Sequence, residues 1–346
     1  MRLRTLLLLS PLLGLGVVVW FSLQAGVSLA GVTGMVPLPF HLMAMGAFIL
    51  SLLSRGARIA LLARGLGSRL GILESVAVQL TGEAAAAATP SRSGSDPARV
   101  LLMKRLGVDL PTGVGVLAGE IMAEGVALGI VVLALFLFLP EPRMVVLGAL
   151  PYSMVSLALP LSGFLLLRRP AGRHPPRIWL ALRLGERRWR EVRGGARRFR
   201  SKAMALMRLD RLTIWAVLLA SLVHVLARLA LLPVLALGLG SQVPLGPLVA
   251  WPLFLLYAGS LLPPPGGGGA IEVTFLAALN SVVGEVELAG ILLWWRVYTF
   301  YLGALTGGLI VVLALGRRGL SELGPGRKSN EMGAAGGDPL LQGRGR

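Results

Sequence analysis

Cysteine is absent from this sequence, and charged residues are scarce. Without Cys the chain can form no disulfide bond, no thiolate metal site and no Cys nucleophile. Charged residues make up 14% of the 346 residues, whereas a soluble domain carries about 25%. Hydrophobic residues make up 55%. Because so little charge is available to face water, lipid must surround much of the surface.

Histidine is also scarce, and nucleotide-binding motifs are missing. Three scattered His with no Cys argue against a zinc site. The chain contains no Walker motif, so an ATP-driven pump is not expected. We therefore expect no metal ion or other cofactor, and no catalytic residue.

Long apolar runs are abundant instead, and a membrane span needs about 20 such residues. The predicted full spans are residues 5–24, 37–54, 114–138, 144–167, 212–239 and 288–316. The first run follows Arg2 and Arg4 in the manner of a signal peptide, but it is too long for one, so we expect it to remain as a span. The sequence thus predicts an all-α, polytopic membrane helical bundle over residues 1–318, followed by a disordered tail over 319–346 that is rich in Gly and polar residues.

Two further apolar segments, 72–105 and 247–283, are interrupted by Pro, Gly and polar residues. Each is too broken to cross the membrane as one helix, so we interpret both as re-entrant helical hairpins. Such hairpins are tolerated only where protein or a water-filled cavity covers their backbone.

The distribution of Lys and Arg predicts the orientation. Arginines are frequent after the second span and in the loop 168–211, and neither Lys nor Arg occurs between Arg228 and Arg296. Both termini are therefore predicted to be cytoplasmic, in a chain of the cytoplasmic (inner) membrane. With this orientation the two hairpins enter from opposite sides, as in transporters built from inverted repeats.

The net charge of +18 does not indicate nucleic acid, because the arginines lie at the ends of apolar runs and in one loop. In the loop 168–211, aromatic and aliphatic residues alternate with Arg, a pattern typical of an amphipathic helix that lies against anionic lipid headgroups. A solvated basic loop that only sets the topology would give the same composition.

The second hairpin contains the most informative motif, a Pro- and Gly-rich break followed by Glu272. Proline stops the preceding helix, glycines permit unusual backbone conformations, and the helix that restarts offers free N–H groups to an anion. The substrate-binding candidates here are Pro265, Gly266, Gly267, Gly269 and Glu272. The alternative is a simple turn between packed helices, with Glu272 as a cap.

The matching break in the first hairpin provides the candidates Thr89, Arg92, Gly94 and Arg99. An arginine can bind phosphate through two parallel hydrogen bonds. The alternative is an ordinary cytoplasmic loop whose arginines follow the positive-inside rule.

Ionisable residues inside the spans form the last group. Glu120 and Glu124 share one helix face, as do His224 and Arg228. We expect Glu120 to pair with Arg228, either structurally or in transport that includes proton coupling. Arg296 and Tyr298 in the last span are further substrate-binding candidates, and Arg296 is the expected charged neighbour of Glu272.

The break ending in Glu272, followed one helix later by Arg296-Val297-Tyr298-Thr299-Phe300-Tyr301, resembles the lysylphosphatidylglycerol synthase transmembrane (flippase-like) family. The resemblance covers residues 40–316. In this family a Pro-Gly-Gly-x-Gly-x-x-Glu segment precedes an apolar Arg-x-x-x-Tyr stretch. The first hairpin departs from the family's Pro-Gly-Arg-x-Gly-Glu, because Ser95 follows Gly94 and the carboxylate, Asp96, comes one position later.

The resemblance implies a lipid translocase that moves an anionic or aminoacylated phospholipid across the membrane. The soluble synthase domain of the full enzymes has no counterpart here, so the synthase reaction is not expected. Two alternatives stay open: an enzyme or enzyme subunit in polyprenyl-phosphate-linked sugar metabolism, for which Glu83 and Asp96 are the candidate metal ligands, and a membrane scaffold. The sequence is compatible with a homo-oligomer or a partner enzyme.

Overall fold

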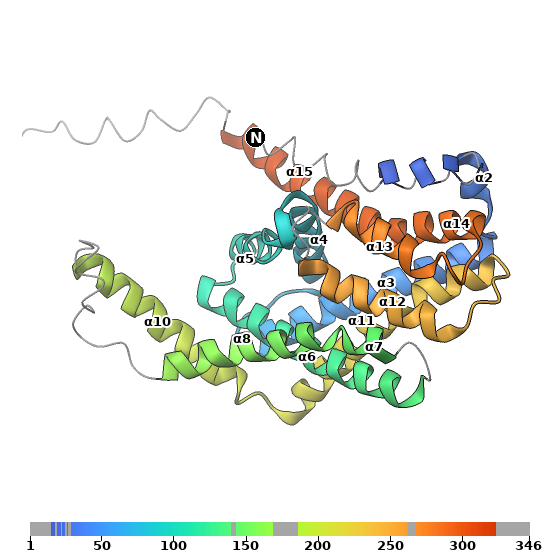
Figure 1. The fold of residues 1–346 in the computed structure, drawn as a ribbon. Helices are drawn as coiled ribbons and strands as arrows, with labels where there is room; N and C mark the ends of the chain where they lie inside the picture. The colour runs from blue at the N-terminus through green and yellow to red at the C-terminus, as the bar shows by residue number, and fades with distance from the viewer. Residues whose placement is uncertain are drawn as a thin grey trace, which may run out of the picture.

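The computed structural model describes residues 29–139, 143–168, 186–261 and 267–322, with single residues and short runs between 15 and 26. Every regular element in these residues is a helix (Figure 1). The all-α prediction is therefore confirmed for the described part of the chain. The apolar composition and the helix lengths together place this chain in a membrane.

Five helical segments are long and apolar enough to cross a membrane. They are α3 (Leu38–Gly65), α6 (Leu110–Phe138), α7 and α8 (Arg143–Leu147 and Leu150–Arg168, apolar over Arg143–Gly163), α11 (Arg211–Gly238), and α14 with α15 (Glu285–Arg296 and Leu302–Glu322, apolar over Glu285–Leu313). Each matches one of the predicted spans. The first predicted span, 5–24, lies largely outside the described residues, as does the whole of the predicted tail after 322.

Helix α3 is longer than predicted. The expected span ended at residue 54, with Arg55 and Arg58 in the loop after it. The helix instead continues to Gly65, and the Arg58 side chain is fully buried. The assignment of these two arginines to a loop was wrong, because ion pairs inside the bundle compensate their charge and allow the helix to continue.

Helices α3 and α11 form an antiparallel pair at the centre of the bundle. Gly238 at the end of α11 lies against Phe40 at the start of α3, and Gly65 at the end of α3 lies against Leu209 just before α11. At both places a Cβ atom would overlap the neighbouring side chain, so glycine permits the close approach.

Both broken segments form pairs of short helices. The first comprises α4 (Ile72–Ala88), the 3₁₀ turn η1 (Pro90–Arg92) and α5 (Ser95–Arg105). The second comprises α12 (Leu245–Tyr257), the 3₁₀ turn η2 (Ala258–Leu261) and α13 (Ala270–Leu279). At about 1.5 Å per residue, even α4, the longest of the four, is shorter than the roughly 30 Å hydrocarbon core.

The two hairpins open at opposite ends of the bundle and meet at their tips. The first follows the end of α3, and the second follows the end of α11, which is antiparallel to α3. Their turns η1 and η2 are in contact. Segments more than 160 residues apart in the sequence therefore converge at one place inside the bundle.

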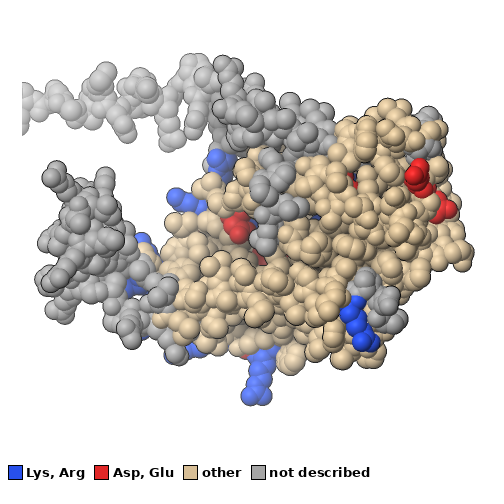
Figure 2. All heavy atoms as spheres, in the orientation of Figure 1, with Lys and Arg blue, Asp and Glu red and all other residues tan. Residues whose placement is uncertain are grey.

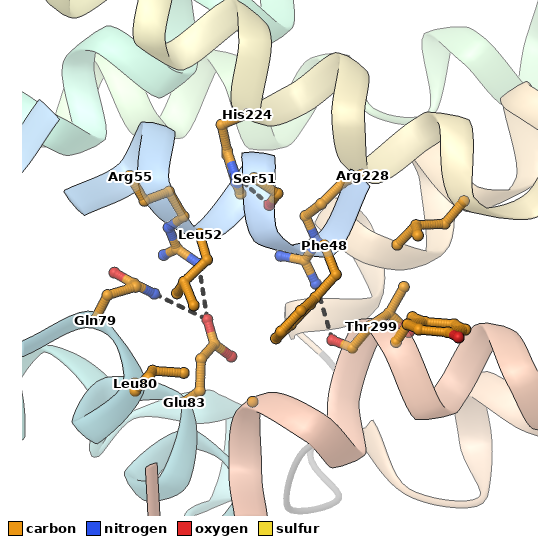
Figure 3. Close-up of a pocket in the computed structure, with 13 residues that line it drawn as sticks. Phe48, Ser51, Leu52, Arg55, Gln79, Leu80, Glu83, His224, Arg228 and Thr299 are labelled. Carbon is orange, nitrogen blue, oxygen red and sulfur yellow. Dashed lines mark hydrogen bonds and ion pairs between the residues drawn. The ribbon is translucent and has the colours of Figure 1, made fainter. Parts of the chain in front are cut away.

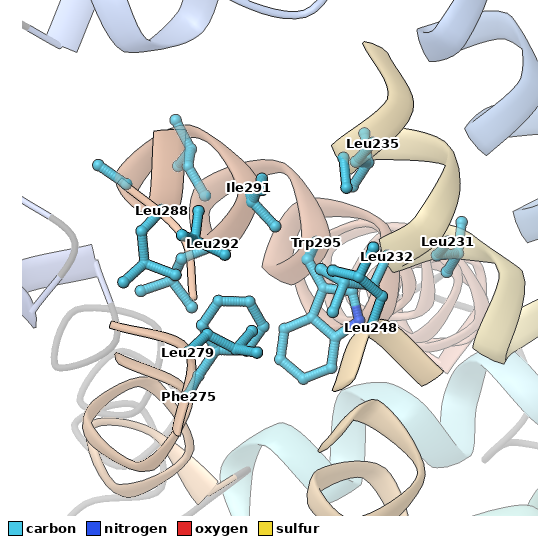
Figure 4. Close-up of a cluster of buried hydrophobic side chains, with 14 of the residues drawn as sticks. Leu231, Leu232, Leu235, Leu248, Phe275, Leu279, Leu288, Ile291, Leu292 and Trp295 are labelled. Atoms are coloured by element: carbon cyan, nitrogen blue, oxygen red, sulfur yellow. The ribbon is translucent and has the colours of Figure 1, made fainter. Parts of the chain in front are cut away.

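A buried apolar cluster fixes the second hairpin against α11 and α14. Phe275 of α13 stacks on Trp295 of α14 with ring centroids 5.0 Å apart. Figure 4 shows these rings beside Leu232 and Leu248, which come from α11 and α12. This packing sets the position of α13 relative to α14.

Helix α10 (Glu186–Leu206) occupies much of the predicted basic loop and projects from one end of the bundle (Figure 1). Lys202 Nζ donates to the carbonyl oxygen of Leu66, 2.7 Å away, and so caps the end of α3. Residues 169–185 of that loop lie outside the described residues. Figure 2 shows a largely uncharged face, with Lys and Arg at the end that carries α5 and α10 and further ones along the lower edge of the view.

Candidate functional site

A buried ion-pair network connects α3, α5 and α6. Arg58 Nη2 donates to Glu120 Oε1 at 2.6 Å and to Glu124 Oε2 at 2.8 Å. Arg99 of the first hairpin donates to the other oxygen of Glu120. Glu120, Arg58 and Arg99 are at most 3% exposed. Charges this deeply buried are tolerated only when they are paired, so the network fixes α5 against α3 and α6.

A second carboxylate, Glu83 of α4, binds two arginines. Arg55 Nη1 donates to its Oε1 at 2.8 Å, and Arg92 Nη2 donates to its Oε2 at 2.6 Å. Gln79, one turn before Glu83, also donates to Oε1 at 3.0 Å. Because Glu83 is held by arginines and Asp96 lies beside Arg99, both candidate metal ligands are engaged by cationic side chains.

The turn that presents Arg92 has an unusual backbone. Ser91 and Arg92 have φ angles of 48° and 57°, in the left-handed region that non-glycine residues rarely adopt. Thr89 Oγ1 accepts from the N–H of Gly94 at 2.8 Å and donates to the carbonyl of Ala85 at the same distance. A Cβ at Gly94 would overlap Thr89. Two of the predicted substrate-binding residues, Thr89 and Gly94, thus build the turn. Strain of this kind clusters at functional positions.

The second hairpin contributes the ion pair that the sequence predicts. Glu272 lies in the first turn of α13, and its Oε1 lies 2.7 Å from Nε of Arg296. The two side chains are 0% and 3% exposed. Gly267 and Gly269, with φ angles of 71° and 81°, form the turn that leads into α13. Pro265 and Gly266 lie outside the described residues.

Arg228 of α11 differs from the other buried arginines. Its Nη2 donates to the carbonyl oxygen of Thr299 at 3.3 Å, and no carboxylate within the described part of the chain forms an ion pair with it (Figure 3). Thr299 lies in the π-helical turn η4 (Val297–Tyr301), a feature often found at functional positions. Among the described residues Arg228 therefore has no direct acidic partner, although Glu83 lies close enough to attract it.

Three arginines converge where the hairpin tips meet. Arg92, Arg228 and Arg296 line a small cavity of about 20 Å³, which Gly259 of η2 and Ile271 of α13 also border. They come from the first hairpin, α11 and α14. The guanidinium group of Arg296 also lies 4.5 Å from the ring centroid of Phe300. We name this cavity the arginine pocket.

The charges around the pocket do not balance. Six arginines are buried or half-buried in this region, Arg55, Arg58, Arg92, Arg99, Arg228 and Arg296. Four glutamates accompany them, Glu83, Glu120, Glu124 and Glu272. The described residues therefore carry an excess of two positive charges here, or of one when Asp96, the exposed partner of Arg99, is counted. An anion could compensate this excess.

A second cavity of about 40 Å³ lies on the other side of Arg228 (Figure 3). Glu83, His224 and the predicted Tyr298 are among its lining residues. His224 Nδ1 shares a 2.9 Å hydrogen bond with Ser51 Oγ, and its Nε2 lies 3.9 Å from Glu124. With these polar groups the cavity is large enough to hold water. We name it the polar cavity.

The prediction that Glu120 pairs with Arg228 was wrong. Glu120 is occupied by Arg58 and Arg99, and Arg228 instead contacts the backbone of η4. Sequence reasoning also missed the part played by Arg55, Arg58, Gln79 and Glu83. The signal was available in part, because Arg55 and Arg58 are spaced to share a helix face next to an apolar run.

A family model for the lysylphosphatidylglycerol synthase TM region matches residues 7–307. The chain belongs to this family. The match includes both hairpins, the ion-pair network and the arginine pocket, and it confirms the resemblance inferred from the sequence. No curated protein matches the chain.

Membership in this family indicates a membrane function connected with lipids. The description of the matched family concerns the membrane region, and the match contains no catalytic domain. Three residues that the sequence singled out lie together around the hairpin tips inside that region: Arg92 and Glu272 of the two hairpins and Arg296 of the last span.

Proposed function

We propose that this chain is a lipid translocase, which moves an anionic or aminoacylated phospholipid between the leaflets of the cytoplasmic membrane. In this proposal both hairpins re-enter the membrane, from the cytoplasmic and the outer side respectively. The end of the bundle that carries α5 and α10 faces the cytoplasm, together with both termini.

The observation that carries the proposal is the arginine pocket at the meeting point of the hairpin tips. An arginine inside the membrane without a direct acidic partner costs free energy, because its charge is removed from water. Such a residue therefore points to a functional role. Arg228 is such a residue, and Arg92 and Arg296 lie around the same cavity. The phosphate that phospholipids share is a strong partner for arginine, because the planar fork can form two charge-assisted hydrogen bonds.

The geometry suggests how a headgroup passes from one hairpin to the other. A phosphate that enters beside the first hairpin meets Arg92, which can leave Glu83 to Arg55 when it turns toward the phosphate. Arg228 and Arg296 then bind the phosphate from the other side, while the acyl chains remain in the bilayer. In this scheme Glu272 holds Arg296 in place between transport cycles.

Protonation supplies a means of coupling to an ion gradient. Glu124 is bound by Arg58 on one side and faces His224 across 3.9 Å on the other. His224 lines the polar cavity, where a proton could arrive through water, and Glu124 lies next to His224. We propose that transport is passive or driven by protons, with Glu120, Glu124 and His224 as the coupling groups.

The test is a scrambling assay in proteoliposomes with fluorescent phosphatidylglycerol and a quencher restricted to the outer leaflet. The wild-type protein should expose the inner-leaflet lipid faster than empty vesicles do. Arg228→Gln and Glu272→Gln should lower this rate at least tenfold. Glu285→Gln is the matched control, because Glu285 is exposed in the first turn of α14, the helix that ends at Arg296.

Absence of scrambling by folded wild-type protein, with and without a pH gradient, would refute the proposal. If Glu285→Gln and Arg228→Gln lowered the scrambling rate equally, the arginine pocket would have no specific role in transport. In that case another part of the membrane region would bind the headgroup.

A further inference from the structure

An apolar groove of about 600 Å³ lies on the side of α4 away from the arginine pocket, between α4, α5 and α15. Apart from Thr81, Thr89 and Arg105, its lining side chains are apolar. Leu101, Leu305 and Val312 border it and are between 60% and 71% exposed. Because α15 belongs to a segment long and apolar enough to span a membrane, we expect its exposed Leu305 and Val312 to face the hydrocarbon of the bilayer.

Small residues make the groove deep. Ala84, Ala85 and Ala88 of α4 face Ala304 and Gly308 of α15 across it. Along its inner edge, Gly307 packs directly on the backbone of α4, where a Cβ would overlap the carbonyl oxygen of Leu80. Helices α4 and α15 are thus in direct contact on the side that faces the ion-pair network, and they are separated by the groove on the side that faces the lipid.

The adjacent Gly308 faces open space, whereas Gly307 is in close contact with α4. A Cβ added there would meet no heavy atom within 4 Å, although the residue is half-buried and lines the groove. Among the described residues, no side chain fills the space in front of Gly308. Water has few polar partners in such a space, whereas a hydrocarbon chain gains dispersion contacts with every wall.

One end of the groove is basic. Arg105 in the last turn of α5 lines it, and Lys104 precedes Arg105 in the same turn. A Lys or Arg near the membrane surface attracts anionic lipid headgroups. A chain in the groove would thus place its phosphate beside Arg105. Thr89 lines the same groove three residues before Arg92 of the arginine pocket.

We propose that this groove is a binding site for one acyl chain of an anionic phospholipid, with the phosphate at Arg105. The shape, the apolar lining and the single basic end fit that class of ligand. The proposal goes beyond translocation: it requires that the chain lies in a membrane, and it holds for a resident lipid as well as for a transported one.

The test uses the full-length protein in vesicles that contain phosphatidylglycerol with a diazirine in one acyl chain. After irradiation, labelled peptides are mapped by mass spectrometry. Labelling per exposed apolar residue should be several-fold higher in residues 81–105 and 304–312 than in the lipid-facing residues of α8. The measurement records binding only, so it stays informative if the protein does not scramble lipid.

Gly308→Leu should fill the groove and reduce this labelling several-fold without loss of folded protein. The matched control is Gly46→Leu in α3, where an added Cβ also meets no atom within 4 Å and which does not line the groove. Arg105→Gln should leave the groove open but remove the preference for phosphatidylglycerol over a phosphatidylcholine probe.

Three results would overturn the proposal. Labelling of the groove no higher than that of α8 would mean that another segment or a second copy covers it. Unchanged labelling in Gly308→Leu would place the lipid elsewhere. Equal labelling of the wild-type protein by the phosphatidylglycerol and phosphatidylcholine probes would exclude an anionic headgroup at Arg105.

Discussion

Replacement of Glu120 by Gln is the most direct test of the ion-pair network. Glu120 is 2% exposed and accepts hydrogen bonds from Arg58 and Arg99, so the substitution removes the charge that compensates both. Arg58 keeps Glu124 as a partner, whereas Arg99 keeps only Asp96, which is exposed to solvent. Removal of one partner from a buried pair costs about 3–5 kcal/mol.

We expect the melting temperature of purified Glu120→Gln in detergent to fall by roughly 6–10 °C, at about 2 °C per kcal/mol for a chain of this size. Asp96→Asn is the control. Asp96 lies 3.4 Å from the same arginine but is 52% exposed, so its replacement should cost less than about 1 kcal/mol.

A double-mutant cycle measures the interaction between Arg99 and Glu120 separately from the effect of each single substitution on the free energy of unfolding. The loss in Arg99→Gln/Glu120→Gln should be smaller than the sum of the two single losses by about 1–3 kcal/mol, because the double variant leaves no unpaired charge at position 99. Strictly additive losses would refute the reasoning, since they would show that the two side chains do not compensate each other.

Three further predictions concern other parts of the fold. Gly307→Ala should destabilise the protein strongly, because its Cβ overlaps a carbonyl oxygen of α4, whereas Gly308→Ala should be tolerated; thermal unfolding of the two variants compares them directly. Asp109 caps the start of α6, and the hydrogen bond from Thr112 lowers the pKa of its carboxyl group. The cap therefore stabilises the folded protein fully at pH values above the unfolded pKa of about 4. This stabilisation is lost as the pH falls through the lower pKa of the folded state. Asp109→Ala should therefore cost about 1 kcal/mol at neutral pH. Its unfolding curve should approach that of the wild type once the pH has fallen below the lowered folded pKa of Asp109. Arg228→Gln should melt no earlier than the wild type in lipid-free detergent but should lose the rise in melting temperature that added phosphatidylglycerol causes.

The broken hairpins and the pair of Glu272 with Arg296 were predictable from the sequence. Proline and glycine in an apolar run mark a helix break wherever they occur, because their effect on the backbone is local. Glu272 and Arg296 are also isolated charges in strongly apolar surroundings. Charged side chains inside a membrane bundle usually form ion pairs with one another, so Glu272 and Arg296 had few alternative partners.

The network around Glu120 could not be predicted in the same way. An arginine that follows an apolar run looks like a cytoplasmic flank, and the local sequence of Arg55 and Arg58 contains nothing that contradicts this. Only the tertiary structure brings Glu120 and Glu124, more than 60 residues later, beside Arg58. The choice between Arg58 and Arg228 as partner of Glu120 depends on how α3, α6 and α11 rotate against one another, and periodicity alone does not fix that rotation.

The tip-to-tip contact of η1 and η2 has a consequence for the electrical profile of the membrane. If water reaches each tip along its own hairpin, the low-dielectric layer between the two aqueous phases is only a few turns of backbone thick, far less than the roughly 30 Å of hydrocarbon. The transmembrane voltage would then fall almost entirely across that layer, at a cost of about 2.3 kcal/mol per elementary charge and 100 mV. A short step of the lipid phosphate past Arg228 would sense nearly the full potential, so the direction of transport could follow the polarisation of the cell.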